Sequence, residues 1–288
     1  MASTLEAALI DAVEEATGNP VRSLGIVRGG DVAASFRVEL DNGGSLFAKT
    51  HPAPPPGFFT TEALGLTWLA EANAVRIPQV IAVADSPLAF VVLEWIEEGR
   101  PTPRTDRRLG EELAAMHDAG APSFGREDRR TTGSRGLPNT PADDWSTFYA
   151  TCRLLPLARL ASNAQVLPSS TVASLERIAG SLDRFDDGAP PARLHGDLWA
   201  GNRLVGADGN SWLIDPAAHG GHREFDLAMM RLFGGFSDDC FAAYHERHPL
   251  TAGWQDRVSL HQIAPLVVHA IKFGGGYVAA ATAAIEKY

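Results

Sequence analysis

The hydrophobic pattern of the chain changes near residue 100, and this change limits the folds that the chain can adopt. Before that point apolar residues alternate with polar ones, as at Phe36, Val38 and Leu40, and the alternation resumes over 46–48 after a turn at 41–44. Alternation of this kind is typical of an antiparallel hairpin, because successive side chains of a strand point to opposite faces. Beyond residue 103 the apolar spacing is mostly helical. We therefore expect a β-rich lobe followed by a helical one.

The two lobes are expected at residues 1–96 and 97–288, joined near 94–103. The first lobe opens with a helix that starts at the capping box of Ser3 and Glu6 and ends at Gly18. It continues with the hairpin, a crossing helix and two further strands, at 60–73, 79–85 and 88–96. In the second lobe we expect short strands around Leu194, Leu204 and Leu213, and helices at 105–119, 142–163, 170–186, 222–233, 238–247 and 254–286.

Two short stretches carry the strongest chemical signal. "LHGDLWAGN" at 194–202 places His195, Asp197 and Asn202 within eight residues, and "SWLIDPA" at 211–217 ends an apolar run at Asp215. Carboxylate and amide oxygens are the ligands that Mg²⁺ prefers. The five-residue step from Asp197 to Asn202 is the step of kinase catalytic loops. The pattern predicts that Asp197 accepts or orients the proton of an acceptor hydroxyl and that Asn202 and Asp215 are metal ligands.

Phosphoryl transfer from ATP also needs a cation on the phosphates, and the first lobe offers one. Lys49 ends the second hairpin strand, close to the loop containing Gly29 and Gly30, and Glu62 opens the next helix as a possible partner for Lys49. Each of these residues alone has a plain alternative: a turn glycine, a solvated lysine, or a favourable first-turn carboxylate. The order glycine loop, Lys, Glu, Asp, Asn, Asp favours a kinase that uses ATP and Mg²⁺.

Composition excludes some partners. The net charge is −10 and the pI is near 5.3, so we expect no nucleic acid or anionic membrane as a partner. Cys152 and Cys240 are the cysteines, and we expect both to be buried thiols. The chain has neither a secretory signal pattern nor an apolar run of membrane-spanning length, which favours a cytoplasmic protein. Pairs of histidines such as His219 and His222 have a spacing that could suit a metal, but no cysteine accompanies them. A zinc site is therefore not expected.

The chain resembles the fructosamine kinase (ketosamine 3-kinase) family, within the aminoglycoside phosphotransferase and protein-kinase-like group. The segments that carry the resemblance are "LHGDLWAGNRLV", "LIDPAAHGGHREFDLAMMRLFGGF" and "FGGGY" at 273–277. The resemblance implies an α+β, protein-kinase-like fold with a small N-lobe and a larger C-lobe. It implies ATP-dependent phosphorylation of a sugar hydroxyl, O3 in this family, on a free or protein-bound glycated amine. The product would then release the amine, which is deglycation.

Site residues follow from the same resemblance, which implies that Asp197 is the catalytic base. Lys49 would bind the ATP phosphates with Glu62 as its ion-pair partner, and Glu94, Trp95 and Ile96 would form the hinge whose backbone meets adenine. Arg223 and Glu224 are expected to shape the acceptor side, while His195 and Asp226 support the catalytic loop. Trp199 either stacks on the sugar or packs between the catalytic loop and a helix.

Two segments depart from the family pattern. Relatives often carry aromatic residues where His219 and Gly220 stand, and many have Thr-Pro-Gln at 135–137. Both segments are expected to border the acceptor site, so the sugar and the amine stay open, as do the number of Mg²⁺ ions and the choice between monomer and weak dimer. A related kinase for aminoglycosides, choline or plain sugars is the alternative enzyme. A nucleotide-binding protein without catalysis is the non-enzymatic alternative.

Overall fold

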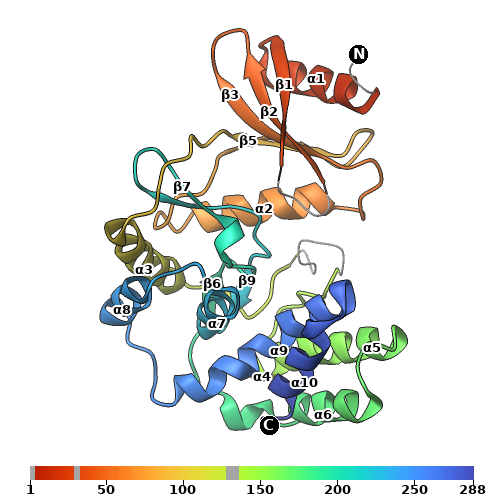
Figure 1. Ribbon diagram of the computed structural model, residues 1–288, viewed down its shortest axis with the longest axis vertical. Coiled ribbons are helices and arrows are strands. Elements are labelled where there is room, and N and C mark those ends of the chain that lie inside the picture. The colour runs from red at the N-terminus through yellow and green to blue at the C-terminus, as the bar shows by residue number, and fades with distance from the viewer. Residues whose placement is uncertain (1–3, 29–32, 128–135) are drawn as a thin grey trace.

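The computed structural model describes residues 4–28, 33–127 and 136–288, and it shows two lobes, one above the other (Figure 1). The N-lobe contains a five-stranded antiparallel sheet of order β1-β2-β3-β5-β4. Its elements are α1 (Thr4–Thr17), β1 (Val21–Val27), β2 (Ala34–Leu40), β3 (Ser45–Thr50), α2 (Phe58–Ala70), β4 (Val80–Ala84) and β5 (Phe90–Glu94).

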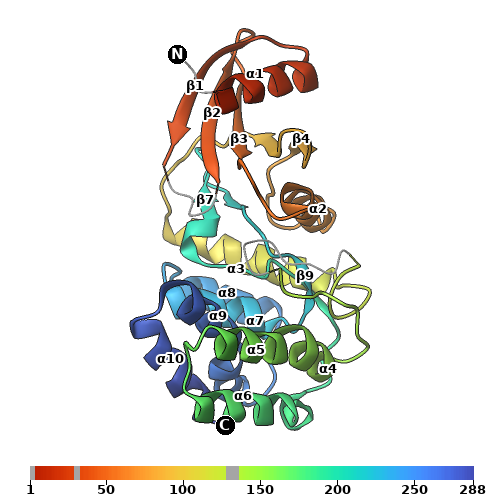
Figure 2. The same ribbon diagram turned by 90° about the vertical axis from the view of Figure 1, so that its right-hand side faces the viewer.

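Alternation along the strands gives the sheet two apolar faces. Phe36 and Val38 of β2 pack with Leu9 and Val13 of α1 in one buried cluster. The neighbouring strand β5 turns Val91 to the other face, where it packs in a cluster contributed by α2. Helix α2 therefore lies under the sheet, on the side of the C-lobe (Figure 2).

The C-lobe is mainly helical, with short strand pairs at its junction with the N-lobe. Strand β6 pairs with β9, and β7 pairs with β8. Its helices and turns are α3 (Pro103–Asp118), α4 (Trp145–Tyr149), the π-turn η1 (Ala150–Leu154), α5 (Leu155–Asn163), α6 (Ser169–Ala179), η2 (Leu182–Phe185), η3 (Ala200–Asn202), α7 (Glu224–Phe233), α8 (Asp238–Arg247), α9 (Trp254–Phe273) and α10 (Gly276–Ile285). Its strands are β6 (Ala192–Leu194), β7 (Arg203–Val205), β8 (Ser211–Leu213) and β9 (His219–Gly221).

The two-lobed α+β, protein-kinase-like fold expected from the sequence is confirmed. The expected single helix over 254–286 is wrong, because Gly274 and Gly275 adopt φ of 64° and 57° and separate α9 from α10. The helix expected over 170–186 ends at residue 179 and is followed by a separate 3₁₀ turn. Strands β1 and β9 were not expected. Glycines at Gly25, Gly220 and Gly221 hide their alternation.

Candidate active site

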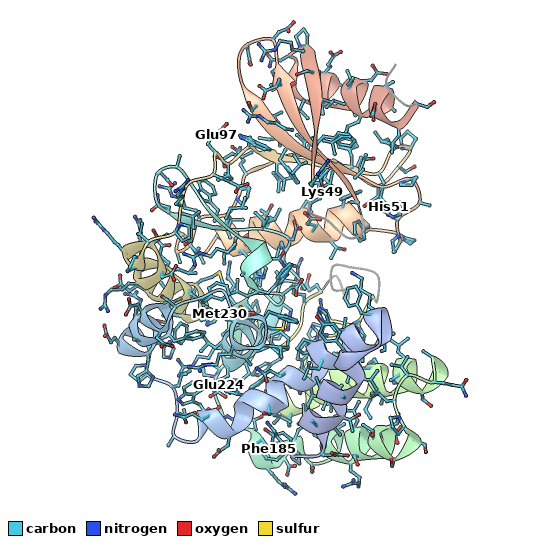
Figure 3. The ribbon with its side chains drawn as sticks, viewed as in Figure 1. Lys49, His51, Glu97, Phe185, Glu224 and Met230 are labelled. Carbon is cyan, nitrogen blue, oxygen red and sulfur yellow. The ribbon has the colours of Figure 1, made fainter. Side chains whose placement is uncertain are left out.

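Lys49 and Glu62 meet beneath the sheet. Lys49 lies on β3, with Val91 of β5 opposite, and Glu62 lies in the first turns of α2. Lys49 Nζ donates to Glu62 Oε1 at 2.9 Å, and both residues are buried. The same ammonium contacts Asp215 Oδ1 from the C-lobe. In Figure 3 Lys49 points from the sheet toward α2 and the junction of the lobes. The sequence-expected pair is therefore present, and Asp215 joins it.

The charges of these partners control the protonation of Lys49. Burial alone would lower the pKa of Lys49, but the carboxylates of Glu62 and Asp215 outweigh burial and raise that pKa well above its usual value. Lys49 is consequently an ammonium at neutral pH, as a phosphate-binding cation must be.

Helix α2 is fixed against the C-lobe by two arginines that sequence reasoning missed. Arg193 and Arg126 place their guanidinium groups 4.5 and 5.7 Å from the ring centroid of Trp68 on α2. Arg126 NH1 also donates to Ala218 O at 3.0 Å, three residues after Asp215. A Cβ at Gly65 would lie 3.3 Å from Arg126, so this glycine permits the close approach. These contacts hold α2, and with it Glu62, beside the segment that carries Asp215.

The catalytic loop follows β6 and requires a glycine. Gly196 has φ of 80°, and a Cβ there would lie 2.1 Å from Ala217 O, a distance that no side chain tolerates. The loop is secured from α7 by Asp226, which accepts from the N–H groups of His195 at 2.8 Å and Gly196 at 2.9 Å. These contacts agree with the supporting role expected of Asp226.

His195 and His117 complete this support. His195 Nε2 donates to Ile214 O at 2.9 Å, and its Nδ1 accepts from Asp197 N–H at 3.3 Å, which identifies a neutral ring carrying its proton on Nε2. Burial lowers the pKa of His195 and keeps it neutral. His117 Nε2 lies 3.2 Å from Asp226 Oδ2. Because His117 is 109 residues from its partner, no local pattern indicated its role.

Asp197, Asn202 and Asp215 come together as expected. Asn202 Nδ2 donates to Asp197 Oδ2 at 3.1 Å and to the Asp197 carbonyl at 2.8 Å. Ile214 N–H donates to Asn202 O at 3.0 Å, which ties the catalytic loop to the strand before Asp215. Burial raises the pKa of Asp197 to about 7, although the hydrogen bond from Asn202 opposes this rise. A carboxylate with this pKa is suited to take up and release a proton near neutral pH.

Asp215 has a backbone conformation that matches a functional position. Its φ is 54°, in the left-handed region that few residues other than glycine occupy. Its side chain is 40% exposed, whereas Asn202 is buried. The turn directs the Asp215 carboxylate to the junction of the lobes, where it also meets Lys49.

The structure gives Arg223 and Glu224 partners within the C-lobe, and their expected acceptor-side roles stay a prediction. Arg223 donates to the carbonyls of His248 at 3.0 Å and Pro249 at 2.6 Å. Glu224 is buried and accepts from Arg257 Nε at 2.8 Å and NH2 at 2.5 Å. Figure 3 shows Glu224 low in the C-lobe, far from Lys49. Both side chains hold C-lobe segments together.

His222 and His261 lie beside Glu224, with candidate metal-ligating atoms within 4.8 Å of one another. Both oxygens of Glu224 are already engaged by the guanidinium of Arg257, and His222 Nε2 pairs with Asp187 Oδ1 at 3.0 Å. The cluster therefore contains its own cation, and we interpret it as a buried charge network.

The segment at His219 and Gly220 is closely packed. His219 is buried, with Nδ1 2.8 Å from Ala217 O, and a Cβ at Gly220 would lie 1.9 Å from Ser123 O. This packing excludes any side chain at position 220. The departure from the family pattern therefore coincides with close packing of β9 against residues 121–123.

Trp199 packs and is exposed at the same time. Its ring covers Gly201, where a Cβ would lie 2.2 Å from the indole, and it meets Phe233 edge-on with centroids 6.4 Å apart. It remains 42% exposed. The expected hinge begins at Glu94, the last residue of β5, and continues through Trp95 and Ile96. Arg37 stacks on Trp95 at 4.5 Å. Gly29 and Gly30 lie outside the described residues.

The two lobes, the buried Lys49–Glu62 pair and the Asp197, Asn202 and Asp215 group define a kinase with a protein-kinase-like fold. The chain belongs to the fructosamine kinase family, since the sequence model of that family matches residues 5–288. A ketoamine kinase from Synechocystis is 35% identical over 92% of this chain and 90% of its own length. Protein-ribulosamine 3-kinase of Arabidopsis thaliana is 31% identical over 95% of this chain and 85% of its own length. A solved fructosamine-3-kinase homologue from Thermobifida fusca is 41% identical and has a TM-score of 0.89, and the match covers 97% of this chain and 98% of the homologue.

Among the described residues, no helix is both long and apolar enough to cross a membrane.

Proposed function

We propose that this protein is an ATP-dependent ketosamine kinase that phosphorylates the O3 hydroxyl of a fructosamine or ribulosamine. The observation that carries the proposal is the assembly of Lys49, Glu62, Asp197, Asn202 and Asp215 at one junction, in a chain of the fructosamine kinase family. Relatives named ketoamine kinase and protein-ribulosamine 3-kinase support the substrate class.

The residues divide the reaction between them. Lys49 binds the ATP phosphates, and Glu62 holds its ammonium in place. Asp197 accepts the proton of the acceptor hydroxyl as that oxygen bonds to the γ-phosphorus and the bond to ADP breaks. Asp226 and His195 keep the Asp197 backbone in position.

The donor set fits Mg²⁺. Asn202 turns its Nδ2 to Asp197, which leaves the amide oxygen as a ligand, and Asp215 offers a half-exposed carboxylate beside it. Both are oxygen ligands, the type that Mg²⁺ selects over nitrogen and sulfur. Bound Mg²⁺ would neutralise charge on the β- and γ-phosphate oxygens.

The product chemistry defines the cellular role. A phosphate on O3 lies next to the C2 carbonyl, so enolisation between C1 and C2 would allow phosphate to leave from C3. The resulting imine at C1 would then be hydrolysed by water, which releases the amine. We therefore propose deglycation of free or protein-bound amines. The cytoplasm is the proposed compartment.

Coupled ATP turnover against an acceptor panel tests the proposal. The panel contains ribulosyl-lysine, fructosyl-lysine, kanamycin, choline and free sugars. We expect turnover with at least one ketosamine and little with the other acceptors. Turnover only with kanamycin, choline or free sugars would keep the kinase chemistry and reject the substrate class.

A further inference from the structure

An exposed aromatic surface lies directly beside the catalytic loop. In the ranges that the structure describes, the prominent exposed large hydrophobic side chains are Ile26, Leu64, Trp199 and Phe273, and the last two belong to one network of rings. The rings of this network, which we name the aromatic shelf, are those of Trp199, Phe233, His269, Phe273 and Tyr277.

The shelf is continuous from the active site outward. Trp199 is two residues from Asp197 and contacts Phe233 at the end of α7. Phe233 lies 4.9 Å from His269 on α9, measured between ring centroids, and His269 lies 5.5 Å from Phe273. Tyr277 closes the network, 6.0 Å from Phe273. A ligand that reached Asp197 would therefore have an apolar path leading away from it.

The break between α9 and α10 forms the outer end of the shelf. Gly274 and Gly275 turn the chain so that Tyr277, at the start of α10, returns to the ring of His269 with centroids 5.0 Å apart. Phe273 is left at the corner, 52% exposed. A corner of this kind keeps an aromatic face open at a fixed place, where an apolar group can cover it.

The chemistry of the acceptor indicates which part of it fits there. The ammonium of Lys272 lies 4.8 Å from the ring centroid of Phe273. A glycated lysine carries a secondary ammonium next to the sugar and four methylene groups beyond it. The methylene groups are uncharged and gain from contact with the exposed ring of Phe273, whereas the ammonium would lose water there.

We propose that Phe273 is a specificity-determining residue whose ring, continued by Trp199 and Tyr277, binds the alkyl chain of the amine attached to the ketosamine sugar. This inference rests on the proposed function and adds a chemical preference to it. Acceptors derived from long-chain amines such as lysine are favoured over acceptors with a short amine.

The test compares two acceptors that share one sugar, the sugar being the one that the turnover panel selects. One acceptor carries Nα-acetyl-lysine through its Nε, and the other carries methylamine. We expect Phe273→Ser to lower kcat/KM for the lysine acceptor about 5- to 20-fold, mainly through KM, since a few methylene contacts have this worth. Turnover of the methylamine acceptor should stay within about 2-fold of the wild type, because it has no chain to lose.

Two further variants control for folding and for surface apolarity. Phe273→Leu keeps apolar volume and should restore most of the preference for the lysine acceptor. Leu64→Ser changes a 50% exposed apolar residue on α2, outside the shelf, and should leave the ratio of the two acceptors unchanged.

The outcomes separate the two proposals. If Phe273→Ser lowers kcat/KM equally for both acceptors, or for neither, the role of Phe273 is overturned while the proposed function stands. Failure of the wild type to phosphorylate either acceptor refutes the proposed function and the shelf with it.

Discussion

Replacing Asp226 by asparagine tests whether a buried carboxylate organises the catalytic loop. Asp226 is fully buried, and it accepts from the N–H groups of His195 and Gly196 and from His117 Nε2. Asparagine has the same shape but only one acceptor oxygen, and its NH₂ group must face one of these donors.

The hydrogen bonds indicate which donor is lost. His117 can adapt by changing its tautomer. With its ring proton on Nδ1 it donates to the hydroxyl of Tyr244, 2.8 Å away, and its Nε2 then accepts from the asparagine NH₂ group. The N–H groups of His195 and Gly196 cannot adapt, and one of them loses its acceptor. An unsatisfied buried donor costs about 1–3 kcal/mol, and the remaining bonds lose their charge assistance. We expect a loss of about 3 kcal/mol in the free energy of unfolding, or about 6–10 °C in Tm.

The pH dependence gives the loss a signature. Burial would raise the pKa of Asp226, but the hydrogen bonds from His117 and from the Gly196 N–H outweigh burial and lower that pKa. A carboxyl group with a depressed folded pKa stabilises the protein above its unfolded pKa, and this contribution disappears as pH falls through the folded pKa. The difference between wild type and Asp226→Asn should therefore be full at neutral pH and shrink below about pH 4.

Thermal and urea unfolding at several pH values measure this difference, and ATP turnover reports the catalytic loop. Asp144→Asn is the matched control. Asp144 is an exposed cap that accepts from Thr147 N–H at 2.7 Å, and asparagine caps a helix equally well. If the free energy of unfolding of Asp226→Asn lay within about 1 kcal/mol of the wild-type value, the inferred organising role of Asp226 would be refuted.

Three further changes test separate parts of the site. Asp197→Asn should lower turnover about 10²–10⁴-fold with little change in nucleotide affinity, measured by coupled turnover and calorimetry; near-full activity would remove Asp197 as the base. Glu62→Gln leaves Lys49 with Asp215 and should lower kcat/KM for ATP about 10²-fold through misplacement of the ammonium, while an unchanged value would show that Asp215 alone positions it. Arg257→Met leaves the buried carboxylate of Glu224 without its guanidinium partner and should lower the free energy of unfolding in urea by about 2–4 kcal/mol. Activity at a permissive temperature should persist, and a loss of activity in the folded variant would favour the acceptor-side role of Glu224.

The parts of the site that the sequence predicted correctly are those set by short spacing. Asp197 and Asn202 are five residues apart in one loop, so the motif itself brings their side chains together. Lys49 and Glu62 are thirteen residues apart, and a strand followed by a crossing helix leaves few other places for the two charges to meet. The change from alternating to helical spacing likewise determined the two lobes.

Long-range partners were not predictable from such patterns, and Glu224 shows why. Arg223, Glu224 and Asp226 matched one family motif, from which we expected Asp226 to support the catalytic loop and the other two residues to shape the acceptor side. A helix turns by 100° per residue, however, so Asp226 faces the loop while Glu224 faces another side of α7. The side chain that satisfies Glu224 is Arg257, 33 residues later on α9.

The same geometry explains how a buried network and an active site share one helix. Asp226 of α7 secures the loop that carries Asp197, and Glu224 of α7 joins the helix to α9, whose far end carries Phe273. The two carboxylates therefore fix the catalytic base and the aromatic shelf to a common support. If α9 were released by Arg257→Met, the acceptor preference tied to Phe273 should weaken before the chemistry at Asp197 does. The ratio of kcat/KM for the lysine and methylamine acceptors, measured in that variant below its unfolding transition, checks this order, and loss of both activities in parallel would contradict it.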